Sequence, residues 1–225
     1  MKTVAVIPAY YEGSRIARVI TDVKAFVDEV VVVDDGSTDI TTKTARAAGA
    51  KVFRHAVNRG QGAALRTGTE AALKLGADIV VHLDADGQHD PATIPALVKE
   101  IEAGSDVVFG SRFLGAEAVG MPAHRKYLLG LAKTFNRLAL GISSRVTDPQ
   151  SGYRALSAKA AQQVDFRQDR MAHCSEILRL VTRSDLAWKE IPTTVRYTEE
   201  TLAKGQKATD AFKIVWQLIL GAFQR

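Results

Sequence analysis

Cysteine is almost absent from this chain, which has one, Cys174, among 225 residues. A single cysteine excludes an internal disulfide and agrees with a reducing compartment, so we expect a cytoplasmic protein. No apolar run approaches the roughly 20 residues that cross a bilayer. The apolar stretch near the N-terminus stops at Pro8, Tyr10 and Glu12 and is too short for the hydrophobic region of a secretory signal.

A strong excess of one charge is also missing. The chain has 30 lysines and arginines against 25 acidic residues, a net charge of +5. This mild excess favours nucleotides, phosphates or an anionic lipid surface as partners over acidic proteins. Because there is no basic run with interleaved aromatics, no zinc-finger spacing and no recognition-helix signature, nucleic acid is not an expected partner.

Short β-branched runs alternate with helical patterns in the first half of the chain. The pattern predicts strands at Thr3–Ile7, Glu29–Val33, Lys51–Arg54, Asp78–Leu83 and Asp106–Phe109, and helices near 14–27, 39–48, 60–75 and 92–103. This alternation predicts an α/β fold with a mostly parallel sheet flanked by helices. After Arg112 the rhythm breaks, and the pattern predicts a helix over 124–140, a loop over 141–152 and a final helix over 209–223.

Two carboxylates, Asp84 and Asp86, follow directly on the apolar run that ends at Leu83. Strand side chains alternate between faces, so acids at this spacing leave the end of the strand pointing the same way. Like charges repel unless a cation or a donor lies between them, and Mg²⁺ and Mn²⁺ prefer carboxylate oxygens. One interpretation is a metal joined to a phosphate-bearing ligand; the other is an Asp-rich turn that caps the helix near Pro91.

A second acidic pair, Asp34 and Asp35, closes the second predicted strand. Ser37 or Thr38 can cap the helix that follows, but capping does not explain the two adjacent acids. Open α/β sheets bind their ligands just beyond the ends of their strands. We therefore expect one of the two acids to point to solvent and the other into a ligand crevice.

For some polar or glycine positions a structural role competes with a functional one. Gly60 and Gly62 open a predicted helix, where they would let an anion approach the helix N-terminus or would only form a turn. His89 is expected to hydrogen-bond or cap rather than to bind metal. His82, inside a predicted strand, is expected to be buried.

Six segments occur in a fixed order: PAYYE at 8–12, DDGSTD at 34–39, NRGQGAALRTG at 58–68, DADGQHDP at 84–91, GSRF at 110–113 and DPQSGYRAL at 148–156. With these segments the chain resembles family 2 glycosyltransferases of the GT-A fold. It resembles most the polyprenyl-phosphate glycosyltransferases of the dolichol-phosphate mannose synthase type. The resemblance implies a metal-dependent, inverting enzyme that moves a hexose or N-acetylhexosamine from a GDP- or UDP-sugar to a polyprenyl or dolichyl phosphate.

The resemblance also implies roles for individual residues. It places Asp86 and Gln88 on a bound Mg²⁺ or Mn²⁺, and makes Asp86, Arg112 and Arg125 the catalytic set. The implied donor-binding residues are Pro8, Tyr10, Glu12, Val33, Asp35, Asp84, Ala85, Asp86, Arg112, Arg196 and Lys207. Lys204 is an alternative to Lys207, because the spacing from Arg196 is longer here than is common in the family.

We expect two parts, a catalytic domain over residues 1–200 and a helical C-terminal tail over 201–225. The predicted last helix carries apolar side chains on more than one face, which favours contact with lipid, with a second copy of the chain or with a membrane subunit. The implied location is the cytoplasmic face of a membrane, as a peripheral protein. Two alternatives stay open: a soluble hydroxyl acceptor, with Glu176 as base, and a non-catalytic nucleotide-sugar binding protein.

Overall fold

The structure, a computed structural model, describes residues 1–114 and 145–194. The helices predicted over 124–140 and 209–223 and the 201–225 tail lie outside the described residues. So do four side chains with expected roles, Arg125, Arg196, Lys204 and Lys207. No helix of the described part is long and apolar enough to cross a membrane.

Strands and helices alternate through the first 111 residues, as the sequence pattern predicts. In chain order the elements are β1 (Thr3–Ala9), α1 (Ile16–Lys24), β2 (Glu29–Asp34), α2 (Thr41–Ala47), β3 (Lys51–Arg54), α3 (Gln61–Lys74), β4 (Ile79–His82), the 3₁₀ helix η1 (Pro91–Thr93), α4 (Ile94–Glu102), β5 (Val107–Ser111), β6 (Arg154–Ser157), α6 (Ala158–Gln163), α7 (His173–Thr182) and β7 (Trp188–Pro192).

The described strands form one sheet in the order β3-β2-β1-β4-β6-β5-β7. The pairs β1 with β2, β1 with β4, β2 with β3 and β5 with β7 are parallel. The short strand β6 is antiparallel to both of its neighbours. The sheet is therefore mostly parallel, as predicted, with one reversed strand near its centre.

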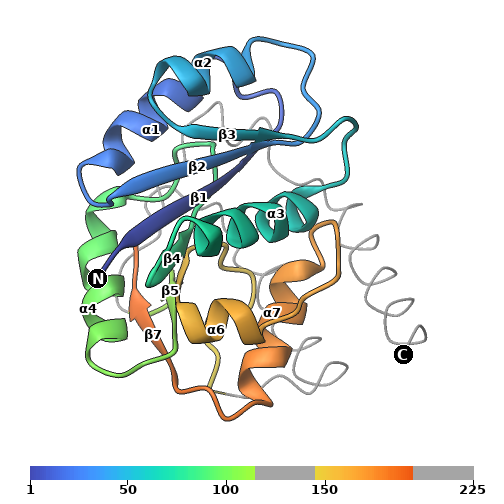
Figure 1. The fold of residues 1–225 in the computed structure, drawn as a ribbon. Helices are drawn as coiled ribbons and strands as arrows, with labels where there is room; N and C mark the ends of the chain where they lie inside the picture. Colours follow the sequence, from blue (N-terminus) through green and yellow to red (C-terminus); the bar gives the residue numbers. More distant parts are fainter. Residues whose placement is uncertain (115–144, 195–225) are drawn as a thin grey trace.

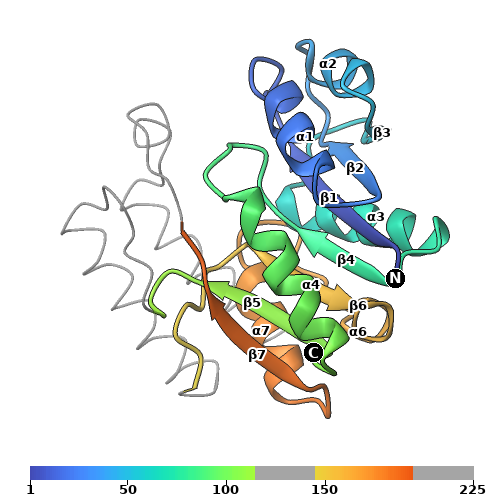
Figure 2. The ribbon, with the colours of Figure 1, turned by 90° about the vertical axis from the view of Figure 1, so that its left-hand side faces the viewer.

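Helices cover both faces of the sheet, as Figures 1 and 2 show. The alternating side chains of each strand divide between two buried clusters. One cluster joins the sheet to α1, α2 and α4, through residues such as Ile20, Ala45 and Leu97. The other joins it to α3, α6 and α7, through residues such as Leu65 and Ile177. Burial on both faces explains the uninterrupted apolar runs of β1 and β2.

The order of the strands fixes where a ligand crevice can form. From β1 the chain moves outward through β2 to β3, and then returns to β4 on the other side of β1. The connections reverse direction between β1 and β4, and ligands of open α/β sheets bind outside the carboxyl ends of the strands at such a point. The segments that follow β1, β2 and β4 all leave this edge, and they carry both acidic motifs.

Candidate active site

The acidic pair lies where β4 leaves the sheet. The Leu83 N–H still donates to the Val6 oxygen at 3.3 Å, and Asp84 and Asp86 follow, both partly buried. Gln61, at the start of α3, donates from Nε2 to Asp84 Oδ1 at 2.6 Å. The Gln88 N–H donates to Asp86 Oδ1 at 2.9 Å. The side chain of Gln61 is a partner of Asp84 that sequence reasoning missed.

The two carboxylates raise the free energy of each other's charged form. Burial raises the pKa of Asp84 and of Asp86, and for Asp86 the charge of Asp84 raises it further. The predicted repulsion is therefore present. A cation between the two groups would relieve it, because an opposite charge within a few ångströms favours the carboxylate form.

Within residues 1–114 and 145–194, no group of three or more His, Cys, Asp or Glu side chains could hold a metal ion. A cation at the acidic pair would therefore have few protein ligands, with Asp86 and Gln88 the expected ones. These two ligands fit Mg²⁺ or Mn²⁺, because such ions are commonly held by one or two carboxylates while phosphate oxygens of the substrate and water complete the coordination shell.

The turn beyond the acidic pair is held by its own contacts. The His89 ring stacks on Tyr153 with centroids 4.8 Å apart, and its Nδ1 accepts from the Asp84 N–H at 3.3 Å. Burial lowers the pKa of His89 to about 4, so the ring is neutral at pH 7. Asp90 caps η1 by accepting from the Ala92 N–H. The capping interpretation thus holds for Asp90 but does not account for Asp84 and Asp86.

The second acidic pair differs from the prediction, because both of its side chains are buried. Asp34 accepts from the Ser37 N–H at 2.9 Å and from the Thr42 hydroxyl. Neither Ser37 nor Thr38 caps α2; their hydroxyls bond instead to the backbone N–H and the phenol of Tyr11. The prediction that one of the two acids faces solvent was therefore wrong. Asp34 holds the turn that follows β2.

The carboxylate of Asp35 lies at the N-terminus of α3, next to the residues that precede the helix. Its carboxylate accepts from the backbone N–H groups of Arg59 and Gly60, the latter at 2.6 Å, and from His55 Nδ1 at 2.7 Å. The anion at this helix end is thus a side chain of the protein itself, as the helix dipole favours. Contact of Asp35 with a nucleotide stays a prediction.

Gly62 serves close packing of the backbone. A Cβ on Gly62 would lie 2.0 Å from the Gln168 oxygen, and the Ala63 N–H donates to the Asp169 oxygen at 3.2 Å. The segment before α7 therefore covers the start of α3. The glycine pair thus allows close backbone packing, and the approach of a ligand anion to this helix end stays a prediction.

The other predicted donor-binding positions gather at the same edge of the sheet. Pro8 and Val33 are buried and are register partners in the β1 and β2 pair, and Ala85 is buried beside Asp84. Tyr10 is 45% exposed, so its ring is open to a ligand. Glu12 pairs with Arg15 at 3.0 Å.

Tyr11 has a left-handed backbone with φ 56°, uncommon for a bulky residue. It packs edge to face on Tyr10 with ring centroids 4.5 Å apart. Backbone strain of this kind concentrates at functional sites. The strained residue thus stands beside an exposed ring that the resemblance assigns to the donor.

Arg112 follows β5 and is held by a buried partner. Its Nε donates to Asp148 Oδ2 at 2.6 Å and its Nη2 donates to Oδ1 at 2.7 Å, a bidentate pair. The Asp148 side chain is fully buried and that of Arg112 is 12% exposed. Burial raises the pKa of Asp84, and the charge of Arg112 opposes that rise, so Arg112 lies within electrostatic reach of Asp84.

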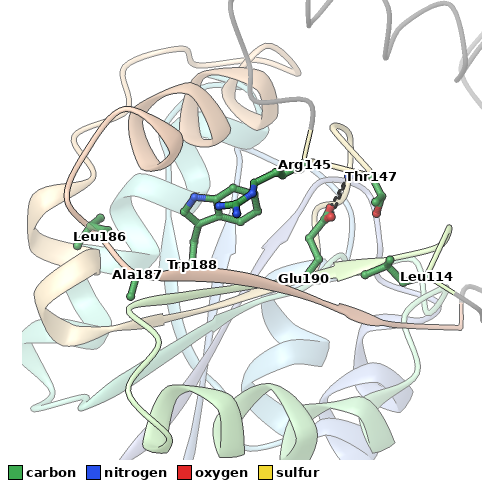
Figure 3. A pocket seen from close by; sticks show the side chains of 7 residues that line it. All are labelled: Leu114, Arg145, Thr147, Leu186, Ala187, Trp188 and Glu190. Carbon is green, nitrogen blue, oxygen red and sulfur yellow. Dashed lines mark hydrogen bonds between the residues drawn. The ribbon is translucent and has the colours of Figure 1, made fainter.

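Glu190 of β7 fixes the loop that carries Asp148. Its carboxylate accepts from the backbone N–H groups of Thr147 and Asp148 at 2.8 to 3.1 Å. Figure 3 shows Glu190 and Thr147 at one side of a cavity of about 520 Å³ beside β7. Its lining residues are Leu114, Arg145, Thr147, Leu186, Ala187, Trp188 and Glu190, none of which is a predicted site residue.

The histidines and Glu176 have structural partners. His82 is buried, as predicted, and bonds through Nε2 to the Thr69 hydroxyl at 2.8 Å. Glu176 on α7 accepts from the backbone N–H groups of Arg167 and Gln168 at 2.9 and 2.7 Å. These contacts hold the segment before α7 and tie up the carboxylate that a hydroxyl acceptor would require as base.

Comparison with known proteins places this site in a family. The model of Glycosyl transferase family 2 matches residues 4–163. A UDP-N-acetylglucosamine–dolichyl-phosphate N-acetylglucosaminyltransferase of Methanococcus voltae is 34% identical, with 96% of this chain and 94% of that protein covered. A dolichol-phosphate mannosyltransferase of Pyrococcus furiosus is 30% identical, over 97% of this chain and 64% of that protein.

Solved structures show the same fold. A glucosyl-3-phosphoglycerate synthase of Mycobacterium tuberculosis, in complex with UDP, gives a TM-score of 0.75 at 24% identity, covering 97% of this chain and 79% of that one. The same enzyme with Mn²⁺, UDP and glucosyl-3-phosphoglycerate gives a TM-score of 0.73 at 23% identity, covering 97% and 78%. With its sheet order, its acidic pair and these similarities, the chain belongs to glycosyl transferase family 2 and is a glycosyltransferase of the GT-A fold.

Proposed function

We propose that this glycosyltransferase moves a hexose or an N-acetylhexosamine from a UDP- or GDP-sugar to a polyprenyl or dolichyl phosphate. The observation that carries the proposal is the partly buried pair Asp84 and Asp86 at the strand reversal, with Arg112 in electrostatic reach. The relatives from Methanococcus voltae and Pyrococcus furiosus, whose names specify dolichyl or dolichol phosphate, support the acceptor class.

The pair fits a divalent cation, Mg²⁺ or Mn²⁺, bound together with the donor diphosphate. When bound, the ion would act as a Lewis acid on the departing diphosphate. The residues expected to hold it are Asp86 and Gln88. The similarity to a fold relative solved with Mn²⁺ and UDP supports this choice, and so does the mutual repulsion of the two acids.

The chain's own residues would orient the reactants. In the proposed reaction an oxygen of the acceptor phosphate attacks the anomeric carbon, and the bond from that carbon to the diphosphate oxygen breaks on the opposite face with inversion. The side chain of Arg112 is held by Asp148, and its guanidinium would form hydrogen bonds with phosphate oxygens. We propose that Arg125 binds the phosphate of the acceptor. Arg196 and either Lys207 or Lys204 would bind the diphosphate of the sugar donor.

A phosphate acceptor needs no general base, because it is already anionic at neutral pH. The described contacts suit this requirement, since the carboxylate of Glu176 accepts from two backbone amides. Removal of a proton from a hydroxyl would demand a carboxylate within hydrogen-bond reach of the acceptor. We therefore favour the lipid phosphate over a soluble hydroxyl acceptor.

We further propose a peripheral position on the cytoplasmic face of a membrane, where a lipid-linked phosphate is available. The net charge of +5 supports it, because basic proteins are drawn to anionic lipid surfaces. Contact through the 201–225 tail, a second copy of the chain or a membrane subunit is part of the proposal.

Labelled donors test the proposal. The purified chain is incubated with Mn²⁺, a membrane lipid extract and one of UDP-N-acetylglucosamine, UDP-glucose or GDP-mannose, and label is followed into the organic phase. We expect one donor to give an organic-soluble product that mild acid releases as free sugar, as a glycosyl phosphate should. The matched control is Asp86→Asn with the same donor.

The fold relatives name a different acceptor class, because they were solved with phosphoglyceric acid as well as with UDP. A parallel reaction therefore replaces the lipid extract with soluble phosphorylated acids. Label that enters only a water-soluble product would overturn the lipid acceptor while leaving the transferase assignment in place.

A further inference from the structure

Arg154, the first residue of β6, is a buried cation outside the contacts described above. The side chain is 0% exposed, and among the residues that the structure describes no hydrogen-bond partner reaches Nε, Nη1 or Nη2. Burial of an unpaired charge costs several kcal/mol even after relaxation of the surroundings. A guanidinium in this position therefore needs a compensating negative charge near it.

The register of the sheet shows which groups surround Arg154. Arg154 is the partner of His82 in the antiparallel pair of β6 and β4, so the two side chains share the face covered by α3 and α7. Asp84 lies two residues after His82, just beyond β4, and Gly152 lies two residues before Arg154, just ahead of β6. A Cβ on Gly152 would lie 3.1 Å from Asp84 Oδ2. The Asp84 carboxylate thus occupies the next position along the face that carries Arg154.

This arrangement makes the two side chains diagonal neighbours. Diagonal neighbours across an antiparallel pair are within reach of long side chains. Gly152 contributes no side chain between them, and the Cβ distance leaves little room for one. Burial raises the pKa of Asp84, and Arg154 is among the groups whose charge opposes that rise, in agreement with this geometry.

The other charged or titratable groups near Arg154 are neutral or otherwise engaged. His82 and His173 are neutral at pH 7, because burial lowers the pKa of both, that of His173 to about 4. Burial raises the pKa of the Cys174 thiol, which lies close to Arg154 and carries no negative charge to balance it. The carboxylate of Asp148 binds Arg112 in a bidentate pair, and that of Glu176 accepts from two backbone amides. Among residues 1–114 and 145–194, Asp84 remains as the negative charge that Arg154 can balance.

We propose that Arg154 is a positioning residue of the donor site, whose buried charge holds the Asp84 carboxylate in place against repulsion by Asp86. The proposal rests on the function proposed above, because it assigns Asp84 to donor binding. It gives Asp84 two supports, the amide of Gln61 at 2.6 Å from the side of α3 and the guanidinium from within the sheet. Loss of the guanidinium would let the acidic pair splay apart.

A double-mutant cycle on thermal unfolding tests the pairing without any assay of activity. The variants are Arg154→Met, Asp84→Asn and the double substitution. We expect each single substitution to lower Tm, and the double variant to lose less than half the sum of the two shifts, because the effects of neighbouring charges that balance each other are not additive. Additive shifts would overturn the pairing.

The matched control is a second cycle that combines Arg154→Met with Asp148→Asn. Asp148 is also a buried carboxylate, but its partner is Arg112. We expect those two shifts to add. If Arg154→Met does not fold, Arg154→Gln takes its place in both cycles. The Tm cycle measures the pairing of Arg154 with Asp84 even if no donor is turned over, so its failure and the failure of the proposed function are distinguishable.

Donor kinetics separate positioning from packing. In Arg154→Gln we expect the KM for the sugar nucleotide to rise about tenfold, with kcat per folded enzyme changed less than about threefold. Arg154→Lys, which keeps the charge, should recover most of that loss. A packing role alone would leave KM unchanged in folded Arg154→Gln, and that result would contradict the proposal.

Discussion

Single residues at this site act in pairs whose members are far apart in the sequence. Arg112 and Asp148 form a bidentate ion pair across 36 positions, and Gln61 donates to Asp84 across 23. The resemblance rests on segments that contain all four residues, but it does not imply that they pair. A rigid partner matters, because a guanidinium that is already oriented loses less freedom when it binds phosphate.

Asp148→Asn should therefore destabilise the protein strongly. It removes the charge that faces a largely buried guanidinium, and breaking a buried pair in this way costs about 3–5 kcal/mol. Chemical denaturation measures the change. Asp22→Asn is the control, because the Arg18–Asp22 pair is 89% and 51% exposed and such pairs contribute about 0–1 kcal/mol. Equal effects of the two substitutions would contradict the account.

His173 gives a pH dependence with a definite sign. Burial lowers its pKa to about 4 from the ordinary 6.5, so between these values the unfolded chain binds more protons than the folded one. Stability from this residue is complete above pH 6.5 and falls as the pH drops toward 4, at about 1.4 kcal/mol per pH unit.

Replacement of the residue by His173→Gln isolates that contribution. The free energy of unfolding is measured by urea denaturation from pH 4 to 7 for both proteins. We expect the slope against pH to be smaller in the variant by about 1.4 kcal/mol per pH unit. Identical slopes would contradict the lowered pKa, because they would mean that His173 binds protons equally well in the folded and the unfolded chain.

Residue-level prediction from sequence succeeded where the chemistry is local. The alternation of strand side chains predicted that Asp84 and Asp86 belong together, and burial and the charge of Asp84 raise the pKa of Asp86. It failed where the partner comes from elsewhere in the fold. Asp35 accepts from the backbone N–H groups of Arg59 and Gly60, 24 and 25 residues later, and nothing in its own segment indicates this.

At the scale of elements, the regular part of the chain was predicted well. The five strands expected from β-branched runs are β1 to β5, with bounds that differ by at most two residues. β6 and β7 were not predicted individually. β6 has four residues, and its antiparallel place between β4 and β5 depends on non-local pairing. β7 is mostly exposed or half-buried, so its apolar signal is weak.

The contact between α3 and the segment before α7 predicts the effect of Gly62→Ala. The added Cβ would lie 2.0 Å from the Gln168 oxygen, which is backbone and cannot rotate away. We expect a loss of about 2–3 kcal/mol, as for other overpacked sites. Glu70→Ala, on the exposed face of the same helix, should change stability by less than about 0.5 kcal/mol. Equal stability of both variants would contradict the packing.

At the scale of the whole molecule, the predicted site residues come from both halves of the sheet. The edge formed by β1, β2 and β4 carries most of the predicted donor-binding positions, and the half with β5, β6 and β7 carries Arg112 and its partner. The acidic pair lies between these halves. The GT-A fold thus brings segments from both ends of the described chain to one site.

The expected division at residue 200 predicts the behaviour of a shortened chain. A chain of residues 1–200 keeps every described strand and helix, the last of which ends at Pro192. We expect its Tm to stay within a few degrees of the full chain while its binding to anionic lipid vesicles falls. Vesicle flotation at low and high salt measures the binding; unchanged flotation would contradict a role of the tail.

The central claim is that Asp86, beside Asp84, holds a cation together with a nucleotide diphosphate. Calorimetric titration of UDP and GDP into the full chain, with and without Mn²⁺, tests it directly. We expect Mn²⁺ to tighten binding of one nucleotide at least about tenfold, or 1.4 kcal/mol. Asp86→Asn should abolish this gain and keep the metal-free affinity. An undiminished gain in that variant would contradict the account.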